Sequence, residues 1–198
     1  MKRFIRAITI AICVITAVAA FAGCSKQDPN APDGFKTASN ETVDYYLYVP
    51  SDWIVDTVEG SQLTSARVSE YGSSNISMIA FTDSDLEYAA VEDYWAYYKE
   101  NLVRVFDLKD DELGDKVTTF EMVNGPTEED PVDGDTTIMG GAPARKYVYT
   151  ATLGGMSLKY MQVIALKNHT FYVLTYTADA SNYSEDPVLA IVDNFKFK

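Results

Sequence analysis

Residues 144–178 read ARKYVYTATLGGMSLKYMQVIALKNHTFYVLTYTA, and this stretch decides the fold of the chain. Its runs 144–153, 156–167 and 170–178 are rich in β-branched and aromatic residues, which is typical of β-strands. The two connections, Gly154-Gly155 and Asn168-His169, have a length that favours tight hairpins. We therefore expect a three-stranded antiparallel meander.

The register of these hairpins predicts a meander that is apolar on both faces. If Leu153 faces Met156 and Lys167 faces Thr170, the side chains separate into two sets. One face collects Tyr147, Tyr149, Leu158, Tyr160, Ile164, Leu166, Phe171 and Val173, and the other Val148, Met161, Val163, Ala165, Tyr172, Leu174 and Tyr176. A sheet with one wet face alternates apolar and polar residues, so this one must be covered on both sides.

Two amphipathic segments can supply the covers. Apolar residues recur at helical spacing over 91–106, after a plausible capping box of Ser84 and Glu87. They recur again over 188–195, behind Asp186-Pro187, where proline suits the first turn of a helix. Further short strands are expected at 45–49, 64–70, 76–82 and 117–122. The predicted fold class is α+β, an α/β/α sandwich with an antiparallel sheet between helices.

The first 23 residues have the order of a secretory signal. Lys2, Arg3 and Arg6 precede the uncharged run 7–22, and small residues come before Cys24. The run is shorter than the roughly 20 residues that a membrane-spanning helix needs, so we interpret it as cleaved.

The stretch Phe21-Ala22-Gly23-Cys24-Ser25 resembles the bacterial lipobox, with Phe21 where leucine is usual. The resemblance implies lipidation of Cys24, and two or three acyl chains hold a protein durably on a membrane. We therefore expect a lipid anchor on the extracytoplasmic face of the cell membrane. Residues 24–41 are polar and predicted to be a flexible tether, and residues 42–198 a single domain.

Charge and cysteine content exclude several functions. Removing three of the 16 basic residues with the signal, and none of the 29 acidic ones, changes the formal charge from −13 to −16. A nucleic-acid partner is excluded because phosphates need a basic surface, and the domain should stand off an anionic bilayer. With Cys13 removed and Cys24 lipidated, no thiol remains for a disulfide, a metal or catalysis.

The polar candidates favour partner binding over catalysis. His169, the only histidine, belongs to a predicted turn, so we interpret it as a turn residue. The acidic stretch 124–137 lacks the spacing of a calcium loop and is interpreted as a solvated, mobile loop that steers a basic partner. We expect its joint neutralisation to leave the fold intact. The acids are Glu128, Glu129, Asp130, Asp133 and Asp135.

Most of the aromatic residues occupy predicted core positions. Four of them lie in loops or off the apolar stripe of the helix, where amphipathic rings suit a wet interface. These possible partner-binding residues are Trp53, Tyr71, Tyr97 and Tyr183.

The order of these pieces resembles the PsbP-like family, named for an extrinsic protein of the photosynthetic oxygen-evolving complex and also found as bacterial lipoproteins. The resemblance implies an α/β/α sandwich and a non-catalytic binding or assembly module, and it transfers no functional residues. Its features are Tyr48-Val49-Pro50 with Trp53, the helix around Tyr94, GGAPA at 140–144, FYVLTY at 171–176 and DNFKF at 193–197.

We therefore expect a membrane-anchored binding protein that is not an enzyme and has no cofactor or metal. Its partner is an unidentified protein or component of the cell envelope. Two alternatives stay open: a receptor for a sugar or peptide in an aromatic cleft, and a wall-directed hydrolase that uses paired carboxylates.

Overall fold

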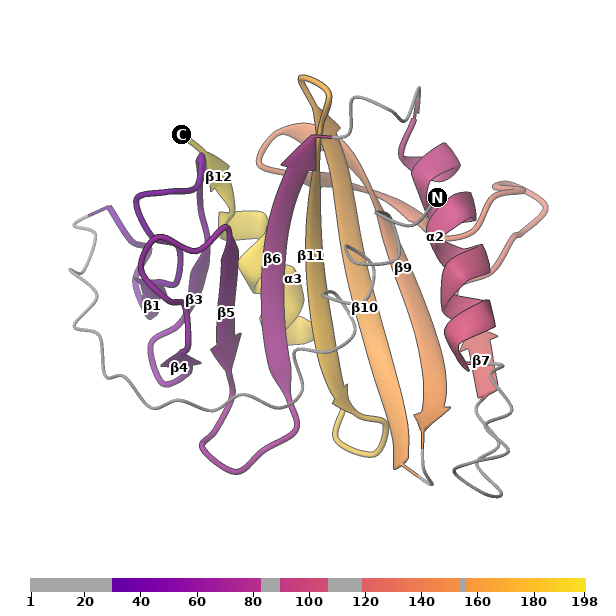
Figure 1. Cartoon of the computed structure of the whole chain (residues 1–198), viewed down its shortest axis with the longest axis horizontal. Helices are drawn as coiled ribbons and strands as arrows, with labels where there is room; N and C mark the ends of the chain where they lie inside the picture. Colours follow the sequence, from indigo (N-terminus) through magenta and orange to yellow (C-terminus); the bar gives the residue numbers. More distant parts are fainter. Residues whose placement is uncertain (1–29, 83–89, 107–118, 154–155) are drawn as a thin grey trace.

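The structure is a computed structural model that describes residues 30–82, 90–106, 119–153 and 156–198. Its centre is an eight-stranded antiparallel sheet in the order β4-β5-β6-β11-β10-β9-β7, with β8 also paired to β9 (Figure 1). The strands are β4 (Ile54–Val55), β5 (Leu63–Arg67), β6 (Asn75–Thr82), β7 (Thr119–Met122), β8 (Asp135–Met139), β9 (Ala142–Leu153), β10 (Met156–Lys167) and β11 (Thr170–Asp179).

Smaller elements surround this sheet. Two short sheets pair β1 (Phe35–Thr37) with β3 (Tyr48–Pro50) and β2 (Tyr45–Tyr46) with β12 (Lys196–Phe197). The helices in the described part of the chain are α2 (Val91–Phe106) and α3 (Asp186–Asn194), close to the two segments expected from the sequence. Neither has the length and hydropathy needed to span a bilayer.

The meander β9–β10–β11 has the predicted register. Leu153 is opposite Met156, and Lys167 is opposite Thr170. Asn168 and His169 join β10 to β11 with φ of 51° and 62°, the left-handed backbone that tight two-residue hairpins require. His169 is exposed in this turn, where the sequence analysis placed it.

Each face of the sheet has its own apolar core, and the side chains of the meander divide between the two cores as predicted. On one face, α2 contributes Trp95, Tyr98 and Leu102 to a cluster with Tyr149 and Ile164. On the other face, Val188, Ile191 and Val192 of α3 pack with residues such as Met161, Val163 and Leu174. In Figure 1, α3 lies behind β6 and β11, while α2 lies beside β9 and β7.

The cover on the α3 face is mixed rather than purely helical. Residues of the N-terminal strands, including Tyr45, Leu47 and Val49, join α3 in the same core. Trp53 belongs to this core and is 4% exposed, so its interpretation as a surface candidate is wrong.

The tether predicted for residues 24–41 extends too far into the domain. Phe35–Thr37 pair with β3, and the Ala38 backbone N–H donates to the Leu47 carbonyl at 2.7 Å. The polar composition suggested a coil here, but β3, which follows soon after in the sequence, holds this backbone in a strand. Residues 1–29, the capping box of Ser84 and Glu87, and residues 117–118 lie outside the described part.

Trp95 provides a test of the α2 core. Its ring stacks on Tyr147 with 4.0 Å between ring centroids. Because truncation leaves a large cavity, we expect Trp95→Ala to lower the free energy of unfolding by roughly 3–5 kcal/mol, measured by urea denaturation.

The matched control is Tyr71→Ala, because Tyr71 is 93% exposed. This change is expected to alter the free energy of unfolding by no more than about 0.5 kcal/mol. Equal effects of the two substitutions would contradict the placement of Trp95 in the core.

Candidate functional site

The acidic loop is held against the domain at Asp133. The Asp133 carboxylate accepts a hydrogen bond from the Trp95 indole Nε1 at 3.3 Å and forms an ion pair with Lys99. Trp95 and Lys99 are four residues apart on α2, so both side chains lie on the same side of the helix. The loop is therefore fastened to the helix that covers the sheet.

A second contact of the loop is centred on Arg145 of β9. The Arg145 guanidinium donates to Glu92 Oε1 of α2 at 2.7 Å and forms an ion pair with Asp130. Guanidinium presents several donors in a planar fork, so it can serve both carboxylates. Its hydrogen bond is the main reason why the pKa of Asp130 lies below the usual carboxyl value.

Lys146 adds a third contact, and this one faces α3. Its ammonium group lies 3.3 Å from Asp135 and 3.2 Å from Glu185, at the start of α3. The predicted mobile loop is therefore anchored through three of its five acids. Of the five, Glu128 and Glu129 are exposed and form no ion pair within the described residues.

This geometry corrects the interpretation of the loop. Asp130, Asp133 and Asp135 neutralise basic groups of the same chain, so they are not free to attract a basic partner. We now expect joint neutralisation of the five acids to destabilise the fold, because each of these ion pairs would lose one member. Sequence reasoning missed the contacts because their basic partners lie on α2 and β9, outside the loop.

The four aromatic candidates lie on separate elements in different environments. Tyr71 is exposed in the β5–β6 connection, and Tyr97 is partly exposed on α2. Tyr183 is partly buried, with 5.5 Å between its ring centroid and that of Tyr176. With Trp53 in the core, the structure does not bring the four together as one site.

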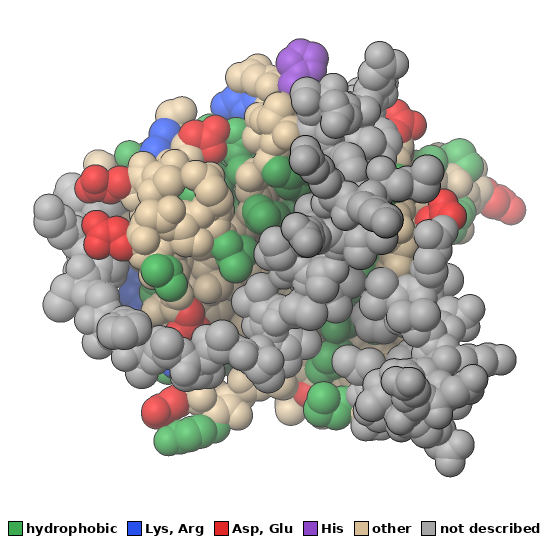
Figure 2. Space-filling view, in the orientation of Figure 1, with side chains coloured by type: hydrophobic (Ala, Val, Ile, Leu, Met, Phe, Trp, Pro, Cys, Tyr) green, Lys and Arg blue, Asp and Glu red, His purple; other side chains and the backbone are tan. Residues whose placement is uncertain are grey.

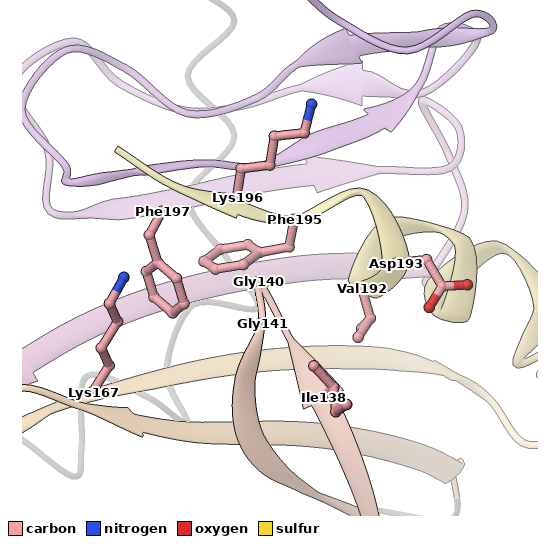
Figure 3. A pocket seen from close by; sticks show the side chains of 9 residues that line it. All are labelled: Ile138, Gly140, Gly141, Lys167, Val192, Asp193, Phe195, Lys196 and Phe197. Atoms are coloured by element: carbon pink, nitrogen blue, oxygen red, sulfur yellow. The ribbon is translucent and has the colours of Figure 1, made fainter.

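A pocket of 540 Å³ opens at one end of the sheet, where the β8–β9 hairpin meets the end of α3 and β12 (Figure 3). Its volume is within the range of roughly 300–1,000 Å³ that is usual for ligand sites. The residues that line it are Ile138, Gly140, Gly141, Lys167, Val192, Asp193, Phe195, Lys196 and Phe197.

Glycine in the β8–β9 turn shapes the pocket. Gly140 and Gly141 have φ of 60° and 81°, values that side-chain-bearing residues rarely adopt. A Cβ on Gly140 would lie 2.8 Å from the Phe197 ring and 2.9 Å from the Phe195 ring. The absence of that atom lets both rings pack directly against the turn.

The pocket carries charges at two ends with apolar groups between them. Figure 3 shows the two lysines here called the pocket lysines, Lys167 at the lower left and Lys196 above the rings with its side chain extending away from them, and Asp193 at the right. Lys167 Nζ lies 3.8 Å from the centroid of Phe197, and Lys196 Nζ lies 5.7 Å from that of Tyr48. A cation over an aromatic face is attracted by the ring, but its charge is not neutralised.

The sequence contained one signal of this site. The segments 140–144 and 193–197 both belong to the pattern that resembles the PsbP-like family. They are some fifty residues apart, and nothing in the local sequence shows that they meet. Within the described ranges, His, Cys, Asp and Glu form no group that could hold a metal ion.

The loop contacts predict different effects for two acids of similar chemistry. Asp133→Asn removes the charge that faces Lys99 and weakens the hydrogen bond to Trp95, so we expect it to cost about 1–2 kcal/mol in chemical denaturation. Glu128→Gln changes an exposed acid in the same loop and should alter the free energy of unfolding by less than about 0.5 kcal/mol. Indistinguishable stabilities would show that the Asp133 contact does not hold the loop.

Sequence comparison with protein families and with curated proteins gave no match. Solved structures do match the fold. Cyanobacterial PsbP (CyanoP) from Synechocystis is 13% identical with a TM-score of 0.55, covering 88% of this chain and 99% of CyanoP. A variant of the protein Mog1 is 10% identical with a TM-score of 0.50, covering 78% of this chain and 90% of its own.

A protein from Bacteroides thetaiotaomicron is 12% identical with a TM-score of 0.51, covering 83% of this chain. The match covers 48% of that protein, so this chain spans about half its length. Similarity at these identities concerns the fold alone, because one fold serves many functions. The chain therefore has a PsbP/Mog1-like fold, built on a large antiparallel sheet.

Proposed function

We propose that this chain is a lipoprotein of the extracytoplasmic face of the cell membrane, and that its domain is a non-catalytic binding module. The order of a charged segment, an apolar run and small residues before Cys24 supports the anchor. The pocket at the end of the sheet is the observation that carries the binding role.

The pocket exposes apolar and charged groups that a partner could bury or neutralise. Ile138 is 64% exposed at the rim, whereas Val192 and Phe195 beneath it are almost fully buried. Binding would remove apolar surface from water and bring opposite charge to the pocket lysines. Apolar surface beside charged groups is typical of the centre and rim of a protein interface.

The anchor would keep the domain close to the bilayer. Because β1 begins at Phe35, eleven residue steps separate it from Cys24. Even a fully extended chain of this length spans at most about 40 Å. A partner is therefore expected in or near the membrane, or at the adjacent layer of the cell envelope.

We also propose that α2 and α3 are the helical layers of an α/β/α sandwich. The two separate cores support this arrangement, since each contains the apolar side of one helix. If helices cover both faces of the sheet, a binding site can open only at its ends. The pocket lies at one of these ends (Figure 3).

The anchor is tested by Cys24→Ser. This substitution removes the thiol that would accept lipid, so it should abolish metabolic lipid labelling and release processed protein from the membrane fraction. Cys13→Ala, inside the predicted signal, is the matched control and should leave labelling unchanged. Persistent labelling of the Cys24→Ser protein would refute the anchor.

The binding role is tested by crosslinking on intact cells. A photoreactive residue at Ile138 should form a specific adduct with a cell-envelope component, because this side chain is exposed beside the pocket. The same group at Tyr71, which is exposed on the β5–β6 connection, is the control. Identical adducts from both positions, or none from Ile138, would contradict the role of the pocket.

A further inference from the structure

We infer that the pocket binds an extended, acidic segment of a partner polypeptide. The carboxylates of the segment would face the pocket lysines, and an apolar side chain would lie against Ile138 and Phe197. The inference rests on the proposed binding role and names the chemical class of the ligand.

The first argument is that the pocket lysines form no ion pair with a described acid of the same chain. Arg67, Lys99, Arg145 and Lys146 each form an ion pair with an acid of the same chain. Five described lysines form no such ion pair, namely Lys36, Lys159, Lys198 and the two pocket lysines. Of these, Lys167 and Lys196 line the pocket. Their ammonium groups lie over aromatic rings instead. They remain available to an incoming carboxylate.

The surface around this end agrees with the inference. On the face drawn in Figure 2, acidic side chains occur on both sides of the described surface. Basic side chains are seen mainly near the upper left, with acidic side chains beside them. Lys198 lies near β12, and its Nζ donates to the carbonyls of Asn40 and Val43. The charge of the pocket lysines favours a partner segment that carries acids over a basic one.

The second argument is the apolar middle of the pocket. Figure 3 shows Ile138 extending from β8 toward Val192 of α3, with the rings of Phe195 and Phe197 farther along. The two rings meet edge to face, with 5.0 Å between centroids. An aliphatic or aromatic side chain of a ligand would bury surface against Ile138, which the fold leaves exposed.

The third argument favours an extended ligand. Ile138 belongs to β8, whose partner strand in the described part of the chain is β9 alone. The other edge of β8 therefore has backbone groups that no strand in that part of the chain satisfies. An extended segment can align with such an edge, and its alternate side chains then enter the adjacent pocket.

An anionic lipid surface fits this pocket less well. Asp193 lines the end opposite the pocket lysines, where a peptide N–H can donate to it but a lipid phosphate is repelled. The formal charge of −16 after removal of the signal also opposes an extended anionic surface. A short peptide carries only a few charges, and salt screens their repulsion by the rest of the domain beyond about 10 Å at 0.1 M.

The test uses the full chain purified in detergent and a fluorescein-labelled peptide of sequence Glu-Glu-Leu-Phe-Ser. Fluorescence anisotropy should show saturable binding that weakens as salt is raised. Replacing both glutamates of the peptide by glutamine should weaken binding by about tenfold, because the charge partners of the pocket lysines are then lost. Saturable binding that is equal for the two peptides would overturn the acidic class of ligand.

Protein variants locate the site. The double variant Lys167→Glu and Lys196→Glu should weaken binding of the glutamate peptide at least about tenfold. Lys159→Glu is the matched control and should leave binding unchanged, because Lys159 lies over the ring of Tyr183 and does not line the pocket. Ile138→Ser, which leaves the charges in place, should also weaken binding. Equal affinities of the control and the double variant would place the peptide elsewhere and overturn the inference.

Two further outcomes separate this inference from the proposed function. If vesicles of phosphatidylglycerol bind the chain through the pocket lysines and the peptide does not bind, the ligand is a lipid surface and the inference fails. If the photoreactive residue at Ile138 captures a specific partner but the peptide does not bind, the class of ligand is wrong and the binding role stands. If the peptide does not bind and the photoreactive residue at Ile138 captures no partner, both the inference and the binding role are contradicted.

Discussion

Burial of both faces of the β9–β10–β11 meander is the constraint on which the rest of the structure depends. Alternate residues of each strand point to opposite faces, and both sets are apolar. Neither set can remain in water, so one set packs with residues of α2, and the other packs with residues of α3 and the N-terminal strands. Gln162 is a buried polar residue among these apolar side chains, and its Nε2 donates to the Tyr98 hydroxyl at 3.3 Å and to Thr175 Oγ1 at 3.1 Å. The bond to Tyr98 links α2 to β10, and the bond to Thr175 lies within the sheet.

The charges of the chain follow from the same arrangement. Packing α2 against β9 brings Glu92 and Lys99 of the helix beside the loop that precedes β8. Arg145 and Lys146 are consecutive on β9, so they point to opposite faces of the sheet. Arg145 binds acids on the α2 side, and Lys146 binds Glu185 at the start of α3. The acids of this loop look unpaired in the sequence, but in the structure their ion pairs connect the loop to both sides of the sheet.

The pocket lies outside the region in which basic side chains pair with the acids of the loop. The pocket lysines come from the end of β10 and from β12, away from the acids of the loop. Phe197, which lies beneath Lys167, and Phe195 complete the wall against which Gly140 turns. The likeness to CyanoP and Mog1 concerns the fold and not the residues of this pocket, because a shared fold does not transfer a site.

The sequence by itself determined the elements whose pattern is local. The meander, its register, the division of its side chains between two cores, and the helix over 91–106 all follow from spacing and from two short turns. The structure as a whole decided the position of Trp53, the strand at Phe35, the ion pairs of the acidic loop and the pocket. Each of these depends on contacts between different elements, as Ile138, Lys167 and Phe197 meet in the pocket. Periodicity reports which face of an element is apolar, whereas which distant element covers that face is decided by packing and charge pairing in three dimensions.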